Sequence, residues 1–116
     1  MEILYNIINN VHVVYPSGRF DSKSAPEVQE QLDAVFSQGG TRIIINMADV
    51  DFVDSTALTT LVRAQRMAGA KGGDLVLCEL QQPARIIFEL TRLDTVFHIF
   101  SDEQAALAAF KAGESG

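Results

Sequence analysis

The residues with the clearest chemical potential are Asp54, Ser55 and Thr56, which follow the acidic stretch from Val50 to Val53. Each side-chain oxygen could cap the start of a helix by accepting a hydrogen bond from a free backbone N–H. The serine hydroxyl could also carry a phosphoryl group, because a helix N-terminus offers unpaired N–H groups and a partial positive charge that favour an anion. The pattern leaves both roles open at Ser55, and the two are compatible.

Phosphorylation of Ser55 would add about −1.5 to −2 charges at neutral pH, beside Asp51 and Asp54. We expect the fold to survive this change. A partner docked on the helix would meet a different potential, since a facing carboxylate would be repelled and a close apolar contact would be wedged apart. The residues thus predict a binding surface that phosphorylation can switch.

Enzyme chemistry has less support in the sequence. His12 and His98 lie far apart in strand-like segments, and Ser55 lacks the Gly-x-Ser-x-Gly elbow of a hydrolase. No two His or Cys residues have metal-ligand spacing, and no phosphate-binding loop is visible, so no metal and no cofactor is expected. Asp54 follows a strand, as the acceptor of a phospho-aspartate receiver would, but the early acidic pair that would hold magnesium is missing. We predict a protein that is not an enzyme.

A sheet must position the site, and the sequence predicts its strands. Ile3–Ile8 and Val11–Tyr15 are rich in β-branched and aromatic residues, which favours an antiparallel pair at a sheet edge. A turn is expected at Pro16–Gly18. The segment from Ala48 to Val53 is expected only as the lead-in to the site. Shorter apolar runs predict further strands at residues 42–46, 75–78 and 97–100.

Four helices are predicted between and after these strands. Capping-box spacing marks two of their starts, with Ser24 before Glu27 and Ser101 before Gln104. Apolar residues at helical spacing, together with these start signals, place the helices at residues 24–38, 55–71, 83–93 and 101–111.

The predicted order is β-β-α-β-α-β-α-β-α. Helices between short apolar strands require crossover connections and hence a mostly parallel sheet. The antiparallel N-terminal strands make the sheet mixed, so the expected fold is α/β with about four α-helices. Residues 1–112 are predicted to form one domain, followed by a short flexible tail at residues 113–116.

Composition limits the partners and the compartment. The chain has 116 residues, 47% hydrophobic and 21% charged, which suits one globular domain. Its net charge of −6 disfavours contact with nucleic acid or anionic lipid. The single cysteine, Cys78, excludes an internal disulfide, and no apolar run approaches the roughly 20 residues of a membrane span. We expect a cytoplasmic protein with no nucleic acid and no membrane among its partners.

One segment resembles the signature of bacterial anti-sigma factor antagonists of the STAS domain family, namely Asp54-Ser55-Thr56-Ala57-Leu58 after Val50-Asp51-Phe52-Val53. Three more segments are similar to family segments in the same order: Gly18–Asp21, Gly72–Cys78 and Pro83–Leu90. The resemblance spans nearly the whole chain and implies a single STAS-like domain. The family has a glycine where this chain has Ala57, which preserves the helix start but adds a methyl group where a partner could approach.

The resemblance implies partner switching. In such proteins the serine after the motif aspartate, here Ser55, is phosphorylated by an anti-sigma factor that is itself a serine kinase. The unphosphorylated antagonist binds the anti-sigma factor and frees sigma factor, phosphorylation switches this binding off, and a metal-dependent serine phosphatase resets the protein. The family implies a monomer when free. The implied partner-binding residues are Asp21, Asp54, Ser55, Thr56, Ala57 and Leu58.

The resemblance leaves a second role open, because STAS domains also serve as structural subunits beside transport ATPases or in stress-signalling assemblies. There the helix that starts at Ser55 would be a permanent docking surface with no kinase. The intact pair of Asp54 and Ser55 favours the switching role.

Overall fold

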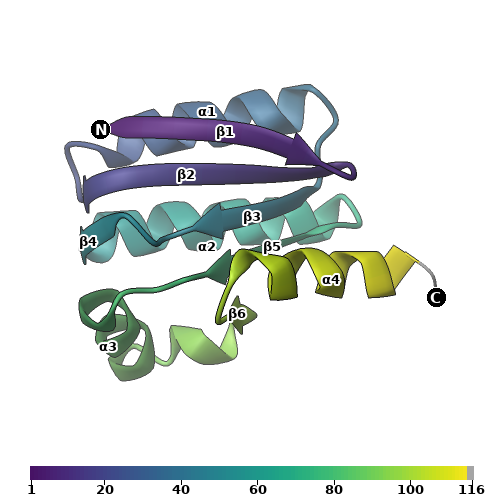
Figure 1. Ribbon diagram of the computed structural model, residues 1–116. Coiled ribbons are helices and arrows are strands. Elements are labelled where there is room, and N and C mark those ends of the chain that lie inside the picture. The colour runs from purple at the N-terminus through teal and green to yellow at the C-terminus, as the bar shows by residue number, and fades with distance from the viewer. Residues whose placement is uncertain (115–116) are drawn as a thin grey trace.

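The structure is a computed structural model that describes residues 1–114, with side chains described for residues 1–112. These residues form a six-stranded sheet and four α-helices (Figure 1). The strands are β1 (Glu2–Ile8), β2 (Val11–Phe20), β3 (Arg42–Asn46), β4 (Val50–Val53), β5 (Asp74–Cys78) and β6 (Ile99–Phe100). The helices are α1 (Ala25–Ser37), α2 (Ser55–Ala70), α3 (Gln82–Leu90) and α4 (Glu103–Glu114), with a short 3-10 turn, η1 (Leu93–Thr95), after α3.

Strands β1 and β2 form an antiparallel pair, and the other strand pairs are parallel. The order across the sheet is β1-β2-β3-β5-β6, while β4 pairs with β2 beyond the end of β3. Parallel neighbours need a crossover, which α1 supplies between β2 and β3, β4 with α2 between β3 and β5, and α3 between β5 and β6. The predicted α/β fold, with a mixed and mostly parallel sheet and four helices, is confirmed.

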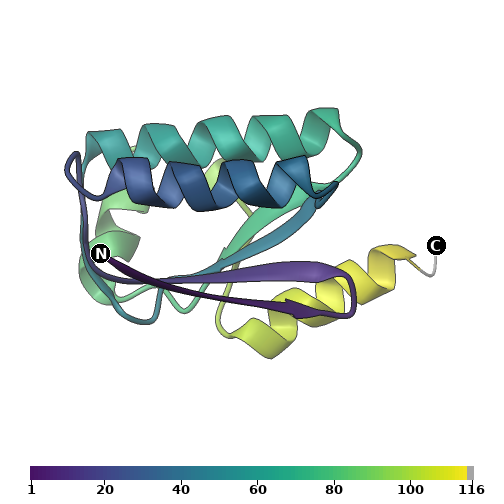
Figure 2. The same ribbon diagram turned by 90° about the horizontal axis from the view of Figure 1, so that it is seen from above.

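Helices cover both faces of the sheet. Figure 2 shows α1 and α2 on one face and α4 on the other. Successive side chains of a strand point to opposite faces, so Ile43 and Ile45 join the core under α1 and α2, while Ile44 joins the core under α4. Helix α3 adds Ala84 and Phe88 to the larger of these two cores. The run of three isoleucines therefore contributes side chains to the hydrophobic cores on both faces of the sheet.

The turn predicted at Pro16–Gly18 is wrong, because these residues lie inside β2. Strand β2 pairs with β3 at His12–Val14 and with β4 from Gly18 to Phe20, so Pro16 falls where β2 changes its parallel partner. Proline lacks the N–H that a strand ladder uses, and it is tolerated at such a gap. Gly18 has a φ of +102° at an irregularity in the β2–β4 register, a conformation that glycine adopts without strain.

The lead-in to the site is itself a strand, which the sequence did not predict. Strand β4 continues along β2 after a connection of residues 47–49. Its ends, Val50 and Val53, are buried, whereas Asp51 and Phe52 between them are exposed. This pattern is too short and too irregular for strand periodicity. Pairing with β2, rather than the composition of the segment, makes β4 a strand.

The predicted capping boxes do not account for the helix starts. Ser24 makes no side-chain bond to α1, and its hydroxyl instead donates to Arg19 O at 2.7 Å and accepts from Asp21 N–H at 2.9 Å. At α4 the cap is Asp102 rather than the predicted Ser101, since Asp102 Oδ1 accepts the N–H three residues later at 2.8 Å. The Ser24 hydroxyl, which the sequence pattern predicted as a helix cap, thus forms hydrogen bonds at the turn after β2 instead.

The helix ends differ from the prediction by a few residues. Leu93, predicted in the third helix, lies in η1, because α3 ends at Leu90 and Arg92 has a left-handed φ of +62°. Helix α4 continues to Glu114 and includes the first two residues of the predicted tail. Residues 115–116 of that tail lie outside the described residues.

Candidate functional site

Ser55 is exposed and is the first residue of α2, at the carboxyl end of β4. Parallel strands direct their carboxyl ends to one edge of a sheet, where the loops that follow them meet and form sites. Strands β2 and β4 are parallel neighbours with Phe20 beside Val53, so the turn after β2 lies next to the start of α2. A second protein can therefore reach the Ser55 hydroxyl together with that turn.

The helix cap at this site is Asp54. Its backbone is extended, with φ −113° and ψ −177°, and its Oδ1 accepts the N–H of Ala57 at 2.9 Å. A cap of this kind satisfies one of the free N–H groups of the first turn. The capping role that the sequence left open between three residues thus belongs to Asp54, and the helix start does not depend on the Ser55 hydroxyl.

The Asp54 carboxylate also holds the neighbouring turn. Its second oxygen, Oδ2, accepts the N–H of Ser22 at 3.0 Å, and the Asp54 N–H donates to Phe20 O at 3.3 Å. One side chain therefore fixes the turn after β2 against the start of α2. The surface around Ser55 is built from two segments that are far apart in the sequence.

Asp21 stabilises the same turn from within. Its Oδ1 accepts the N–H groups of Lys23 at 3.0 Å and Ser24 at 3.2 Å, and its Oδ2 lies 3.6 Å from Nε of Arg19. Partial burial acts to raise the pKa of Asp21, but the hydrogen bonds from Ser24 and Lys23 and the charge of Arg19 outweigh it and lower that pKa. Asp21 is therefore a carboxylate at neutral pH, adjacent to the Ser55 region.

Arg19 and Phe52 form a stacked pair on the surface beside the site. They are direct neighbours in the β2–β4 register, and Cζ of Arg19 lies 3.9 Å from the centroid of the Phe52 ring. A guanidinium over an aromatic face is a cation–π contact. The pair places an aromatic ring and a cation on the exposed surface of β2 and β4, shortly before the start of α2.

The six residues predicted to bind a partner do not all face outward. Asp21, Asp54 and Ser55 come together at the turn, and Thr56 is exposed next to them. Ala57 and Leu58 are buried in the core, so their side chains support α2 from beneath. The expectation that the methyl group of Ala57 lies where a partner approaches is therefore wrong.

Sequence reasoning missed two contributors to this surface. Ser22 was not singled out, although its N–H is the group that joins the turn to Asp54. Arg19 was noted only as part of the Gly18–Asp21 resemblance. Phe52 was noted only as part of the lead-in from Val50 to Val53, and its contact with Arg19 depends on the unpredicted pairing of β4 with β2.

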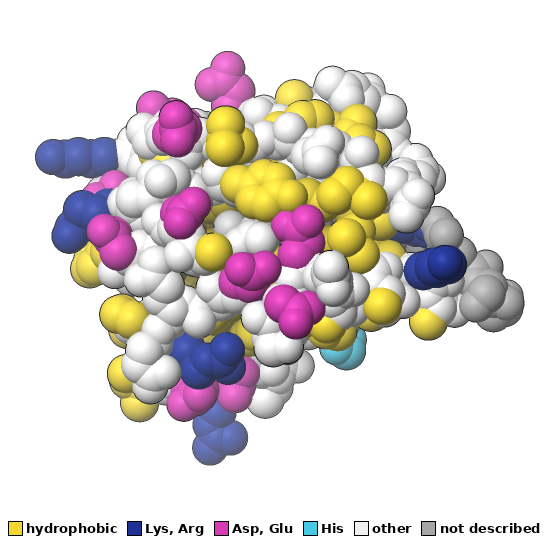
Figure 3. Space-filling model, in the orientation of Figure 1, with side chains coloured by type: hydrophobic (Ala, Val, Ile, Leu, Met, Phe, Trp, Pro, Cys, Tyr) yellow, Lys and Arg dark blue, Asp and Glu magenta, His cyan; other side chains and the backbone are white. Residues whose placement is uncertain are grey.

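A second group of polar residues gathers at the ends of β3 and β5. Asn46 is buried, and its amide Nδ2 donates to Glu79 at 3.2 Å and to Glu103 at 3.0 Å, which anchors the start of α4 to the sheet. Burial and the hydrogen bond with Glu103 raise the pKa of Tyr15 to about 12. Figure 3 shows acidic side chains beside hydrophobic surface on the face of the molecule that carries α4. Within residues 1–114, no group of His, Cys, Asp and Glu side chains is arranged to hold a metal ion.

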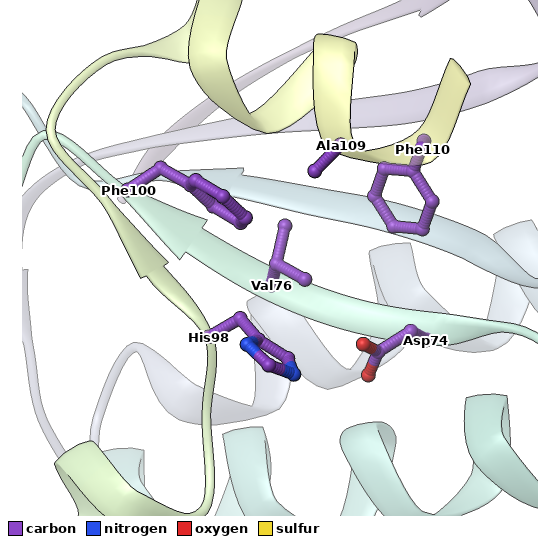
Figure 4. A pocket seen from close by; sticks show the side chains of 6 residues that line it. All are labelled: Asp74, Val76, His98, Phe100, Ala109 and Phe110. Carbon is purple, nitrogen blue, oxygen red and sulfur yellow. The ribbon is translucent and has the colours of Figure 1, made fainter. Parts of the chain in front are cut away.

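A cavity of about 200 Å³ lies between α4 and the edge of the sheet, lined by Asp74, Val76, His98, Phe100, Ala109 and Phe110 (Figure 4). Figure 4 shows Val76 between the two phenylalanines, with His98 and Asp74 on the side away from α4. The residues that line this cavity are not those of the Ser55 surface.

None of the helices in the described part of the chain has the length and apolarity that a bilayer crossing requires.

The family model for the STAS domain matches residues 2–106. The chain is similar to the anti-sigma-B factor antagonist of Bacillus subtilis, with 30% identity over 91 residues that cover 78% of this chain and 83% of that protein. It is also similar to the anti-sigma F factor antagonist of Paenibacillus polymyxa, with 24% identity over 98 residues and 84% coverage of both chains. The crystal structure of an anti-sigma factor antagonist from Mycobacterium paratuberculosis matches with a TM-score of 0.85 and 26% identity, covering 93% of this chain and 92% of that chain.

Proposed function

The chain belongs to the STAS domain family, and on that premise we propose that it is an anti-sigma factor antagonist whose affinity for its partner is set by phosphorylation of Ser55. The partner is an anti-sigma factor that is also a serine kinase, and a metal-dependent serine phosphatase reverses the modification. The protein acts by binding rather than by catalysis, in the cytoplasm, and as a monomer when free. The names of its relatives support the antagonist role.

The observation that carries the proposal is the exposure of Ser55 at a helix start that Asp54 already caps. The hydroxyl is accessible to a kinase and is not needed to hold the fold. A phosphate at this position would meet the partial positive charge of the α2 N-terminus, so α2 should remain folded after modification.

The switch follows from charge at a fixed surface. Phosphoserine adds about −1.5 to −2 charges beside the carboxylates of Asp21 and Asp54, which the turn after β2 and the cap of α2 hold in place. A partner that fits the neutral hydroxyl then faces a larger negative potential and a bulkier group. Repulsion and steric conflict at the centre of an interface cost affinity, so the phosphorylated form releases the anti-sigma factor.

The decisive experiment incubates the wild type, Ser55→Ala and Thr56→Ala with the cognate anti-sigma kinase and ATP, followed by intact-protein and peptide mass spectrometry. We expect one added phosphate on the wild type and on Thr56→Ala, and none on Ser55→Ala. Phosphate on the Ser55→Ala variant would reject Ser55 as the acceptor. A stable complex with an ATPase from cell extract, with no phosphate on any variant, would instead favour a structural STAS subunit.

A further inference from the structure

The segments that frame Ser55 are strongly acidic and carry few cations. Residues 18–24 and 49–58 contain four aspartates but only two basic residues, Arg19 and Lys23. A phosphate added at Ser55 would therefore be repelled by its neighbours unless a cation moved towards it. The two basic residues differ in their contacts, which makes their roles separable.

Arg19 is held in a defined place but by weak and exposed contacts. Its guanidinium stacks over Phe52 at 3.9 Å, and its Nε lies 3.6 Å from Asp21 Oδ2. The arginine side chain is 63% exposed. Exposed ion pairs of this length contribute little and exchange readily, so a stronger anion nearby would displace the contact with Asp21.

The geometry directs Arg19 towards Ser55. Strands β2 and β4 run parallel, so the step from Arg19 to Asp21 points the same way as the step from Phe52 to Asp54. The Nε of Arg19 already lies 3.6 Å from an oxygen of Asp21, two residues along in that direction. Extended residues advance by roughly 3.3 Å each, which puts Ser55 roughly 10 Å beyond Phe52. The arginine and phosphoserine side chains span this gap from its two ends.

We propose that Arg19 senses phosphate at Ser55 by leaving Phe52 and Asp21 to pair with the phosphoserine. Phosphate offers up to twice the charge of a carboxylate and three acceptor oxygens, and the planar guanidinium can pair with two of them at once. The move uncovers the Phe52 ring and removes the cationic partner of the Asp21 carboxylate, which keeps its hydrogen bonds from Lys23 and Ser24. Phosphorylation then changes the shape of the docking surface as well as its charge. This inference rests on the proposed function, which makes Ser55 the acceptor.

The test installs phosphoserine at position 55 during translation, so it needs neither the kinase nor the anti-sigma factor and can fail independently of the proposed function. Three phosphorylated proteins are compared: the otherwise wild-type chain, Arg19→Gln and Lys23→Gln. The two glutamine variants lose the same charge from the same segment, and both positions are exposed. Lys23→Gln therefore controls for the overall change in net charge.

Two NMR measurements decide the question. Phosphorus-31 titration should show that Arg19→Gln raises the second pKa of the phosphoserine by roughly half a pH unit, and that Lys23→Gln raises it by clearly less. The Arg19 side-chain protons should be shifted upfield by the Phe52 ring in the unphosphorylated protein, and phosphorylation should abolish this shift. The same spectrum of Phe52→Leu, which lacks the ring, shows how much of the Arg19 proton shift the ring causes. An equal pKa in the two glutamine variants, or Arg19 signals that remain ring-shifted after phosphorylation, overturns the proposal.

Discussion

Asp54 Oδ2 accepts the backbone N–H of Ser22 at 3.0 Å, which joins the turn after β2 to the start of α2. The other oxygen of the same carboxylate caps α2 through Ala57 N–H. Because one side chain fixes both segments, the surface around Ser55 is preformed. Under the proposed function, a preformed surface would lose less conformational entropy on binding.

Replacing Asp54 should therefore destabilise the protein more than an ordinary surface mutation does. We expect Asp54→Ala to lower the free energy of unfolding by about 2 kcal/mol, because a cap and a second hydrogen bond are lost together. Asp51→Ala removes the same charge from an exposed neighbour and should cost less than about 0.5 kcal/mol. Urea denaturation of both variants checks this, and equal losses would show that Asp54 is not the cap that matters.

Charge at Ser55 should weaken binding, whereas loss of the hydroxyl should not unfold the protein. We expect Ser55→Asp to reduce affinity for the anti-sigma factor by about tenfold, or roughly 1.4 kcal/mol. Ser55→Ala should keep the stability of the wild type within about 0.5 kcal/mol, since Asp54 supplies the cap. Calorimetric titration measures the affinities. Ser37→Asp is the matched control, with the same substitution at an exposed residue at the end of α1, and an equal loss there would argue for a non-specific charge effect.

The sequence predicts where this site lies better than it predicts the contacts between the residues that form it. An acidic segment followed by a hydroxyl and a helical pattern is a local signal, so a strand-to-helix junction at Ser55 is readable without a structure. The contact between Arg19 and Phe52 is not local, because it needs β4 to pair with β2, and β4 has no strand periodicity of its own. The Ser24 hydroxyl fails as a predicted cap for a different reason, since it bonds locally to Arg19 O and Asp21 N–H instead of to the first turn of α1.

Gly73 meets a tertiary constraint that the local sequence does not show. A Cβ added at Gly73 would lie 1.9 Å from the carbonyl oxygen of Thr41. We expect Gly73→Ala to lower the free energy of unfolding by about 2 to 3 kcal/mol, because the backbone would have to move.

Gly69 provides the matched control for this substitution. It lies within α2, is exposed and has open space around the added Cβ, so Gly69→Ala should stabilise the protein by about 0.5 to 1 kcal/mol. Thermal and urea denaturation of the two variants should therefore give effects of opposite sign. A Gly73→Ala variant as stable as the wild type would contradict the close approach of Gly73 to Thr41.

His12 should make stability depend on pH near neutrality. It is buried in β2, with Nδ1 in hydrogen-bond contact with the Tyr5 hydroxyl, and burial lowers the pKa of its imidazole. The folded state therefore binds a proton less readily than the unfolded chain, in which histidine titrates near about 6.5. Stability from the neutral ring is fully present above that value and falls as the pH drops below it.

We expect His12→Gln to lose less stability than the wild type between pH 8 and pH 5 in urea denaturation. His98→Gln, the same change at an exposed position, should follow the wild type, and a parallel profile for His12→Gln would show that His12 does not carry the pH dependence.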